Sequence, residues 1–301
     1  MTSMSNQSSR LIVGCGYLGN RVAEHWRQQG RSVAAVTRSA DRAAQFRQAG
    51  LIPVVLDLST DFSRVSIPAA DVVLWSVGFD RAAGVPREKV WLDGLRTLIR
   101  SLPTAPQRFI YVSSTSVYGT GDGGTVDEQT APNPVTDGGR CCVQAEQLMR
   151  ETLQQAFPET QAVVLRMAGI YGPGRLLRRI SDLRSRTPLP GNGDSLLNLI
   201  HVDDAVRMVD FAATADLLSD LFNVVNTGTL TRNQYYSSLA DLVEAPPPVF
   251  TETVPVGGMR GGNKRVTSAF SDPAEPLFRY NDVLAGIRNA VENSQIDTED
   301  R

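Results

Sequence analysis

The chain of 301 residues is poor in the side chains that build disulfide frameworks, metal centres and nucleic-acid surfaces. It has three cysteines, of which Cys141 and Cys142 are adjacent, and this spacing favours free thiols in a reducing compartment. Two histidines and no Cys-x-x-Cys pair provide no zinc ligand set, so we expect no metal. The 30 basic and 32 acidic residues give a net charge of −2 without a basic block, so charge does not indicate a nucleic-acid partner.

Long hydrophobic runs are also missing. No stretch approaches the roughly 18 apolar residues that a membrane-spanning helix needs. The opening segment Met1–Ser9 is too polar for a secretory signal. We therefore expect no membrane partner and a cytoplasmic location.

Short apolar runs alternate with helical stretches through the first half of the chain. The runs are continuously apolar, which is typical of strands buried on both faces of a parallel sheet. The repetition of strand and helix predicts a Rossmann-type α/β fold with a doubly wound parallel sheet. We place the strands at Leu11–Val13, Val33–Val36, Val54–Leu56, Val72–Trp75, Phe109–Val112 and Val163–Leu165, and the helices at Asn20–Gln29, Arg87–Arg100 and Val143–Gln155.

The second half is less regular and contains several Gly–Pro turns. Helical periodicity returns at Asp204–Ala213, Arg232–Val243 and Asn281–Glu292. We predict an NAD(P)-binding Rossmann domain over residues 1–170 and a smaller C-terminal substrate-side α/β region over residues 171–301. No linker marks the boundary, which is soft and leaves the segments of the two regions interleaved.

The first predicted strand leads into the first predicted helix through the spacing Gly-x-Gly-x-x-Gly at Gly14, Gly16 and Gly19. The first glycine permits a tight turn, the second leaves room for a pyrophosphate, and the third lets helix and strand pack closely. The amides of the opening helix, at Tyr17 and Leu18, then face the phosphates. This position between strand and helix predicts a dinucleotide site, and the alternative is a glycine turn of purely structural use.

The second predicted strand lacks the acidic residue that usually binds the ribose of NAD. Arg38 and Ser39 follow it instead, and the guanidinium of Arg38, with that of Arg42, can pair with the 2′-phosphate of NADP. NADP is therefore favoured over NAD, and the alternative is a solvated arginine with a loose choice of cofactor. Asp57 and Leu58 follow the third strand, where they can contact the adenine, although Asp57 can equally serve as a cap.

Later motifs carry a resemblance to a known family. They are Ser113-Ser-Thr-Ser-Val-Tyr118-Gly, Leu165-Arg-Met-Ala-Gly-Ile-Tyr171-Gly-Pro-Gly and Asn198-Leu-Ile-His201-Val-Asp-Asp. The chain resembles the extended short-chain dehydrogenases/reductases, in their NAD-dependent epimerase/dehydratase branch, from about residue 10 to 293. The resemblance implies an oxidoreductase or epimerase-like activity on a nucleotide-sugar-like substrate or a small carbonyl or hydroxyl compound.

The resemblance also implies further site residues. Additional residues are expected to contact the cofactor at the ends of three strands. They are Ser76, Val77 and Gly78 after the fourth strand, Ser113 after the fifth, and Ala168 and Gly169 after the sixth. Substrate contacts fall at Tyr171, Arg175 and Arg178, because arginine forks suit phosphate oxygens. A solvated helix face is an equally good interpretation of these arginines. By analogy alone, the family implies a homodimer formed through the helices at Arg87–Arg100 and Val143–Gln155.

The family mechanism uses a hydroxyl, a tyrosine, and a lysine four residues later that lowers the pKa of the tyrosine. Ser114 matches the hydroxyl, but the tyrosine position falls on Gly138 and the lysine position on Cys142. Two interpretations stay open. A rewired enzyme would use Ser114 with Tyr118 or Tyr171 in catalysis, whereas a non-catalytic NADP(H) sensor would tolerate the loss of both proton-transfer groups. The retained substrate-side motifs favour the enzyme.

Overall fold

The computed structural model describes residues 8–62, 64–119, 123–175, 177–251, 263–269 and 277–296. The chain forms two compact units, each built from three segments of sequence. The first unit consists of Met1–Ser113, Cys141–Leu165 and Met208–Leu221, and the second of Ser114–Arg140, Arg166–Arg207 and Phe222–Arg301. Within the described ranges, no helix is long and apolar enough to cross a bilayer.

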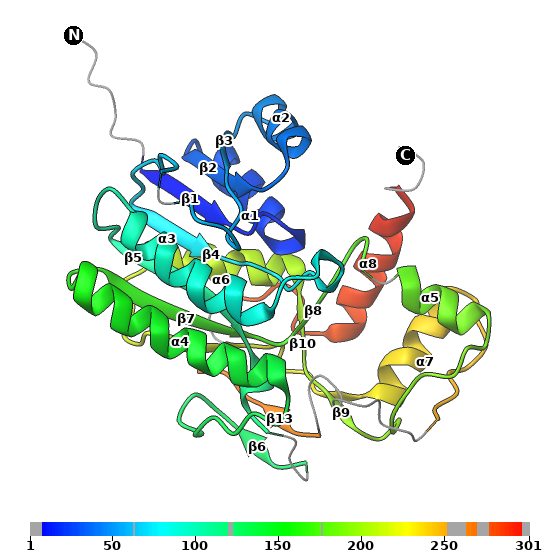
Figure 1. Cartoon of the computed structure of the whole chain (residues 1–301). Helices are drawn as coiled ribbons and strands as arrows, with labels where there is room; N and C mark the ends of the chain where they lie inside the picture. The colour runs from blue at the N-terminus through cyan, green and yellow to red at the C-terminus, as the bar shows by residue number, and fades with distance from the viewer. Residues whose placement is uncertain are drawn as a thin grey trace. The chain divides into compact units, whose positions relative to one another are not determined.

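A parallel sheet of seven strands is the framework of the fold, in the order β11-β7-β5-β4-β1-β2-β3. All of these strands except β11 are labelled in Figure 1. Strand β1 pairs with β2 on one side and β4 on the other, so that Val13 is aligned with Val36 and with Trp75. This order reverses at β1, which is the arrangement of a doubly wound sheet and confirms the predicted fold class. The strands are β1 Ser9–Val13, β2 Ser32–Thr37, β3 Ile52–Val55, β4 Val72–Trp75, β5 Arg108–Ser114, β7 Gln161–Met167 and β11 Leu221–Val224.

The continuously apolar runs are explained by helices that cover both faces of the sheet. Leu11 and Val13 of β1 share one buried cluster with Leu98 and Met149, which lie on α3 and α4. Ile12 is also fully buried, and because side chains alternate along a strand it faces the other side, where α1 packs on β1 and β2. These helices are α1 Tyr17–Gln28, α2 Ala40–Gln48, α3 Leu95–Ser101 and α4 Asp137–Ala156.

Several elements differ from the sequence prediction, among them α4, which begins at Asp137 rather than Val143, and two of the differences have a clear physical reason. The helix expected at Arg87–Arg100 opens as a π-helical turn, η2 Lys89–Gly94, before α3 begins. Gly94 lies so close to the carbonyl oxygen of Leu58 that a Cβ there would be 2.7 Å away. Helix α2 was not predicted, because it buries only Ala43 and Phe46 and so has a weak apolar pattern.

Strand β3 is the last strand on one side of the sheet, and among the described residues no further strand pairs with its outer side. It includes Pro53, which is aligned with Ala35 of β2, and the side chains of Ile52 and Val55 are about half exposed, at 51% and 47%. Proline is tolerated at such an edge because its missing amide hydrogen is not needed by the inner neighbour.

The second unit combines short strand pairs with helices. Strands β8 and β10 pair in parallel, β9 and β12 pair antiparallel, and β6 and β13 pair in parallel. Tyr171 lies in its main apolar cluster, together with Leu239 and Ile287. The elements are β6 Thr125–Val126, β8 Gly169–Tyr171, α5 Leu177–Arg184, β9 Leu196–Leu197, β10 Leu199–His201, the N-terminal part of α6 Val202–Thr214, β12 Leu230–Thr231, α7 Arg232–Leu242, β13 Arg265–Val266 and α8 Val283–Ile296.

Helix α8 approaches the ring of Tyr171 most closely at Gly286. A Cβ at this glycine would lie 2.0 Å from the Tyr171 hydroxyl oxygen and 2.9 Å from its ring carbon Cζ. We therefore expect Gly286→Ala to lower the free energy of unfolding by about 1–3 kcal/mol, as overpacking in a core does. Equilibrium denaturation measures this change.

The hydroxyl is the main obstacle, so Tyr171→Phe in the same chain is expected to restore part of the lost stability. The single variant Tyr171→Phe is the control, since it removes only a 3.4 Å hydrogen bond to the carbonyl oxygen of Val283. If Gly286→Ala instead stabilises the protein by about 1 kcal/mol, as helix propensity alone would dictate, the close packing described here is wrong.

Candidate functional site

The glycine turn brings the end of β1 against the end of β4. Gly14 has a φ of +93°, and a Cβ there would lie 2.6 Å from the backbone of Ser76 and Val77. The Ser76 hydroxyl donates a 2.8 Å hydrogen bond to the carbonyl oxygen of Gly14. A Cβ on Gly19 would lie 2.4 Å from the same oxygen. Both positions therefore require glycine, and Ser76 fixes the turn.

The first turn of α1 is left open to an anion. Gly16 is the N-cap and gives no side-chain cap, and the first turn carries no acidic residue. A Cβ on Gly16 would meet nothing within 4 Å, so this part of the turn borders open space. The positive end of the helix, at Tyr17 and Leu18, can therefore accept phosphate oxygens.

A cavity of about 280 Å³ lies beside this turn, inside the first unit. It gathers residues that the sequence predicted separately as cofactor contacts: Gly14, Gly16, Arg38, Asp57, Leu58, Val77 and Gly78. Side chains from the ends of β2 and β3 and the loop after β4 complete it, among them Val36, Leu56 and Phe79. The cavity thus has an apolar lining with charged groups at its margin, which fits an adenosine and its phosphates.

Two arginines border the cavity, and both are held in place. Arg38 forms an ion pair with Asp80, with 2.5 Å between Nη2 and Oδ2. Arg42 donates a 2.6 Å hydrogen bond from Nη2 to the carbonyl oxygen of Cys15. On the other side Asp57 accepts hydrogen bonds from the amide and hydroxyl of Ser59, at 2.9 and 2.7 Å, and these bonds lower the pKa of its carboxyl.

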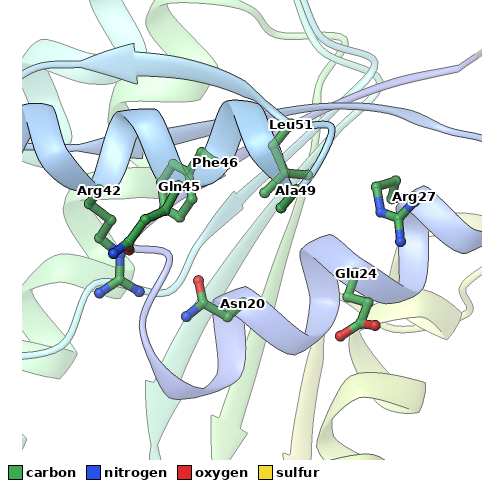
Figure 2. A pocket seen from close by; sticks show the side chains of 8 residues that line it. All are labelled: Asn20, Glu24, Arg27, Arg42, Gln45, Phe46, Ala49 and Leu51. Carbon is green, nitrogen blue, oxygen red and sulfur yellow. The ribbon is translucent and has the colours of Figure 1, made fainter. Parts of the chain in front are cut away.

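Arg42 also borders a second hollow, between α1 and α2. Figure 2 shows its side chain reaching toward the loop before α1, with Asn20 across the groove. The Arg42 guanidinium carbon lies 5.5 Å from the ring centroid of Phe46. This groove of about 390 Å³ is lined by eight residues, of which five are polar and four of those exposed, so we interpret it as the surface crevice between two helices.

The start of α4 carries the position where the family lysine would fall. Cys142 is 4% exposed, and burial raises the pKa of its thiol to about 12. Burial likewise raises the pKa of Cys141 to about 11. The Ser113 hydroxyl donates a hydrogen bond to Oε1 of Glu146, a buried side chain one turn further along the helix. Both thiols are therefore neutral at physiological pH and cannot replace the charge of a lysine.

Arg87 is the cation that acts on these thiols, and it was not predicted from the sequence. Its charge lowers the pKa of both Cys141 and Cys142, against the larger effect of burial. The guanidinium carbon stacks 4.2 Å from the ring centroid of Phe79 and 5.3 Å from that of Trp91. No motif marks such a residue, because the thiols on which it acts lie far later in the sequence.

In the second unit, Ser114 is the last residue of β5 and the N-cap of the short 3-10 helix η3 Thr115–Val117, which Tyr118 follows. The Ser114 hydroxyl oxygen accepts a 3.1 Å hydrogen bond from the amide of Ser116. The Tyr118 side chain is 2% exposed, and burial raises the pKa of its phenol. Ser114 is the more accessible of the two hydroxyls.

A closed network holds the Tyr118 hydroxyl. It donates to Oδ1 of Asn223 at 2.9 Å and accepts from Nη1 of Arg166 at 3.0 Å. The backbone amide of Asn223 donates a 2.8 Å hydrogen bond to Oε1 of Glu128, which connects the network to the loop after β6. The phenol is thus surrounded by its own partners in the interior of the unit.

A buried lysine holds the backbone of the same loop. Nζ of Lys264 donates hydrogen bonds to the carbonyl oxygens of Tyr118 and Gly119, at 2.9 and 3.3 Å. The residue is 1% exposed, and burial lowers the pKa of its ammonium to about 8. No sequence motif predicts this role, although the chain contains only one other lysine, Lys89.

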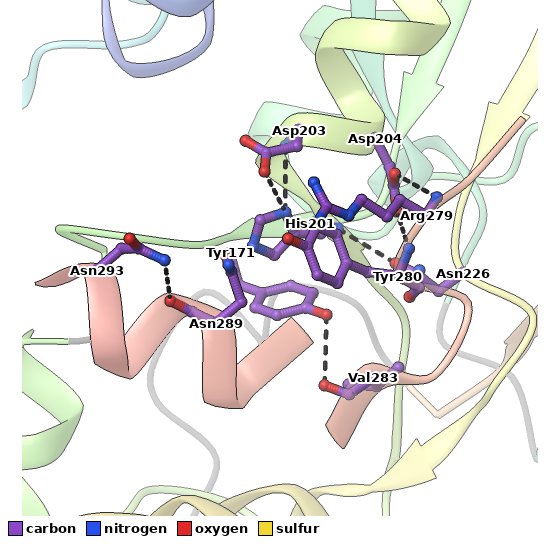
Figure 3. A network of polar contacts seen from close by, with 10 residues as sticks. All are labelled: Tyr171, His201, Asp203, Asp204, Asn226, Arg279, Tyr280, Val283, Asn289 and Asn293. Atoms are coloured by element: carbon purple, nitrogen blue, oxygen red, sulfur yellow. Dashed lines mark hydrogen bonds and ion pairs between the residues drawn. The ribbon is translucent and has the colours of Figure 1, made fainter. Parts of the chain in front are cut away.

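Tyr171 and His201 occupy the interior of the second unit. Tyr171 is 3% exposed, its ring packs edge-on against His201 at 5.2 Å between centroids, and burial raises the pKa of its phenol. Figure 3 shows His201 stacked on Tyr280 and bonded through Nδ1 to the amide of Asp203, at 3.2 Å. Asp204 accepts the amides of Arg279 and Tyr280 at 2.7 and 2.8 Å. The cluster ties α6 to the segment that precedes α8.

The remaining predicted residues lie in both units. Ser39 caps α2 by accepting the amide of Arg42 at 3.3 Å. Ala168 and Gly169 lie in the second unit, where their amides donate to the carbonyl oxygens of Val224 and Asn198 at 2.9 and 3.0 Å. Arg175 is exposed on the turn before α5, and the side chain of Arg178 lies outside the described part of the chain. Among described residues, no three or more His, Cys, Asp or Glu side chains gather as a metal site would require.

The depressed pKa of Lys264 predicts how stability depends on pH. The folded chain releases this proton at a pH of about 8, against 10.5 for an ordinary lysine, so the unfolded chain binds more protons between these values. Lys264 therefore contributes a rise in the free energy of unfolding across this window, while the buried thiols, with their raised pKa, contribute a fall in its upper part. In Lys264→Met we expect this rise to disappear from the pH profile of the unfolding free energy, which chemical denaturation measures.

Lys89→Met is the matched control, because Lys89 is exposed and pairs only with Asp93 at 3.5 Å within the described residues. Its profile should run parallel to that of the unchanged protein. Lys264→Met also leaves two carbonyl groups without a donor. This second effect lowers the free energy of unfolding equally at every pH, so it does not hide the change in slope that the lost titration causes. Equal slopes in all three proteins would refute the buried ammonium.

Comparisons with known proteins place these features in a family. Protein YeeZ of Escherichia coli (strain K12) is 28% identical over 252 residues, which cover 82% of this chain and 88% of YeeZ. A Streptomyces protein named 3-diazoavenalumate denitrifying reductase is 25% identical over 258 residues, covering 79% of this chain and 82% of that protein.

The structural comparison agrees on the fold. The solved structure of MoeE5 in complex with UDP-glucose and NAD superposes with a TM-score of 0.75 at 22% identity, covering 97% of this chain and 100% of that chain. The model of the NAD dependent epimerase/dehydratase family matches residues 11–227, more than half of the chain. The resemblance drawn from the sequence motifs is therefore confirmed, and the chain belongs to the NAD dependent epimerase/dehydratase family.

Proposed function

We propose that this chain is an NADP(H)-dependent oxidoreductase that transfers a hydride to or from a small substrate without a tyrosine–lysine proton relay. The observation that carries the proposal is the cavity beside the glycine turn. At the end of β2 it presents Arg38, with Arg42 close by, in place of an acidic side chain. A guanidinium fork suits a 2′-phosphate and gains nothing from a bare ribose hydroxyl.

In this proposal the first unit holds the cofactor. The pyrophosphate lies against Gly16 and the amides that open α1, and the adenine contacts Leu58 and Asp57. Val77 and Gly78 border the same cavity from the end of β4. When bound, the cofactor supplies or accepts the hydride.

Ser114 is the hydroxyl that we propose orients a carbonyl or hydroxyl group of the substrate. The closed network around Tyr118 supports a positioning role for that residue, and the buried ring of Tyr171 supports a packing role. The names of similar proteins support a small molecule as substrate: one is a reductase, and the MoeE5 complex contains the nucleotide sugar UDP-glucose.

The cofactor preference is testable by calorimetry. We expect NADP⁺ to bind more tightly than NAD⁺, and Arg38→Ala to weaken NADP⁺ binding by about 10- to 100-fold while leaving NAD⁺ nearly unchanged, because a charge-assisted contact to phosphate is lost. Arg47→Ala is the control, since Arg47 is an exposed arginine of α2 that does not border the cavity. Tighter binding of NAD⁺ that Arg38→Ala does not alter would refute the NADP proposal.

Hydride transfer is tested by incubating the NADPH complex with nucleotide sugars and small carbonyl compounds and following oxidation of the nicotinamide. With a substrate found, Ser114→Ala should lower kcat by about a hundredfold, as loss of one oriented donor does. Ser116→Ala, on the same loop, should change kcat far less. Undiminished turnover in Ser114→Ala would exclude the proposed role.

A second candidate is a cofactor-responsive sensor without turnover. It is favoured by the neutral, buried thiols at the lysine position and by the enclosed phenol of Tyr118. Its signature would be a protein partner captured only with, or only without, bound NADP(H), together with no oxidation of NADPH by any compound in the panel. Identical partners in both states would argue against the sensor.

A further inference from the structure

The guanidinium of Arg38, proposed above to bind the 2′-phosphate, already forms an ion pair with a carboxylate of the chain. Asp80, on the loop after β4, places Oδ2 at 2.5 Å from Nη2 of Arg38. Both side chains border the cavity beside the glycine turn, and each is about half exposed, at 56% and 48%. The pair thus joins two margins of the cavity, one at the end of β2 and one after β4.

Asp80 is held in this position from both sides. Its Oδ1 accepts a 3.0 Å hydrogen bond from the amide of Ala82, and it is the N-cap of the 3-10 helix η1 Arg81–Ala83. The hydrogen bond from Arg38 lowers the pKa of the carboxyl, with the Ala82 amide adding to the effect. Asp80 is therefore an anion at neutral pH, and the turn that carries it does not depend on Arg38.

We propose that Asp80 is a specificity-determining residue that competes with the 2′-phosphate of NADP for the guanidinium of Arg38. The inference rests on the NADP site proposed above and adds a second side chain to it. A 2′-phosphate and the Asp80 carboxylate both seek the same planar donor edge, and two anions at one guanidinium repel each other. Binding of NADP then requires Arg38 to exchange one partner for the other.

The other groups near the cavity do not remove this competition. Arg42 already donates to the carbonyl oxygen of Cys15 at 2.6 Å, so it is engaged with the glycine turn. Asp57 is bonded to Ser59 and lies after β3. With NAD the competition is absent, because a ribose hydroxyl is neutral and can donate to the Asp80 carboxylate. The ion pair thus narrows the preference for NADP over NAD.

The test is the affinity of the substitution Asp80→Asn for each dinucleotide, measured by calorimetry. Asparagine keeps an oxygen for the Ala82 amide and is an equally good cap, so the turn is retained. We expect the Kd for NADP⁺ to fall about fivefold, the range of an exposed ion pair. The Kd for NAD⁺ should stay the same or rise.

Asp41→Asn is the matched control, because Asp41 is an exposed aspartate in the first turn of α2 that does not border the cavity. It removes the same charge close to Arg38 in sequence and should leave both affinities unchanged. Thermal unfolding of each variant shows that the fold is retained.

The double variant Arg38→Ala, Asp80→Asn separates exchange from simple repulsion. Without Arg38 no guanidinium is released, so the gain in NADP⁺ affinity from Asp80→Asn should vanish. A gain that persists undiminished, or no gain in the single variant, overturns the exchange and leaves the NADP proposal standing. If the unchanged protein prefers NAD⁺ and Arg38→Ala has no effect, both proposals fail.

Discussion

The contact on which the rest of the structure depends is the approach of the β1–α1 turn to the end of β4. Gly14 touches the backbone at Ser76, and Gly19 touches the carbonyl of Gly14 in turn. This packing sets the direction of α1 and brings its open first turn beside the loop after β4. The cavity, its two arginines and the Arg38–Asp80 pair all lie at the margin of this one junction.

The sequence predicted the parts of the structure that repeat or that need one residue type. Buried parallel strands are apolar throughout, so β4 was located at Val72–Trp75 with both ends correct. Gly14 and Gly19 were recognised because no side chain fits there. Asp80, Lys264 and Arg87 were missed for a shared reason: each acts through a partner far away in the sequence, and no local pattern records such pairing.

The same contrast holds within the candidate catalytic segment. Local motifs identified Ser114 and Tyr118, but only the structure reveals that the phenol is enclosed by Arg166 and Asn223. The loss of the family tyrosine and lysine was visible in the sequence, at Gly138 and Cys142. The cation that acts on Cys142 instead is the guanidinium of Arg87, which stacks on aromatic rings. Its position depends on the course of the loop after β4, which no local motif predicts.

The edge strand β3 has a consequence for how the chain is made. The strands β1 to β4 are complete within the first 75 residues, whereas β7 and β11 come from residues 161 to 224. Until the later segments have been synthesised, the edge of the partly formed sheet on the β5 side has no neighbouring strand. Its unpaired backbone groups can then pair with a strand of another chain. The edge formed by β3 contains Pro53 as soon as it is synthesised, and proline disfavours pairing with a further strand. The nascent chain therefore has one aggregation-prone sheet edge rather than two.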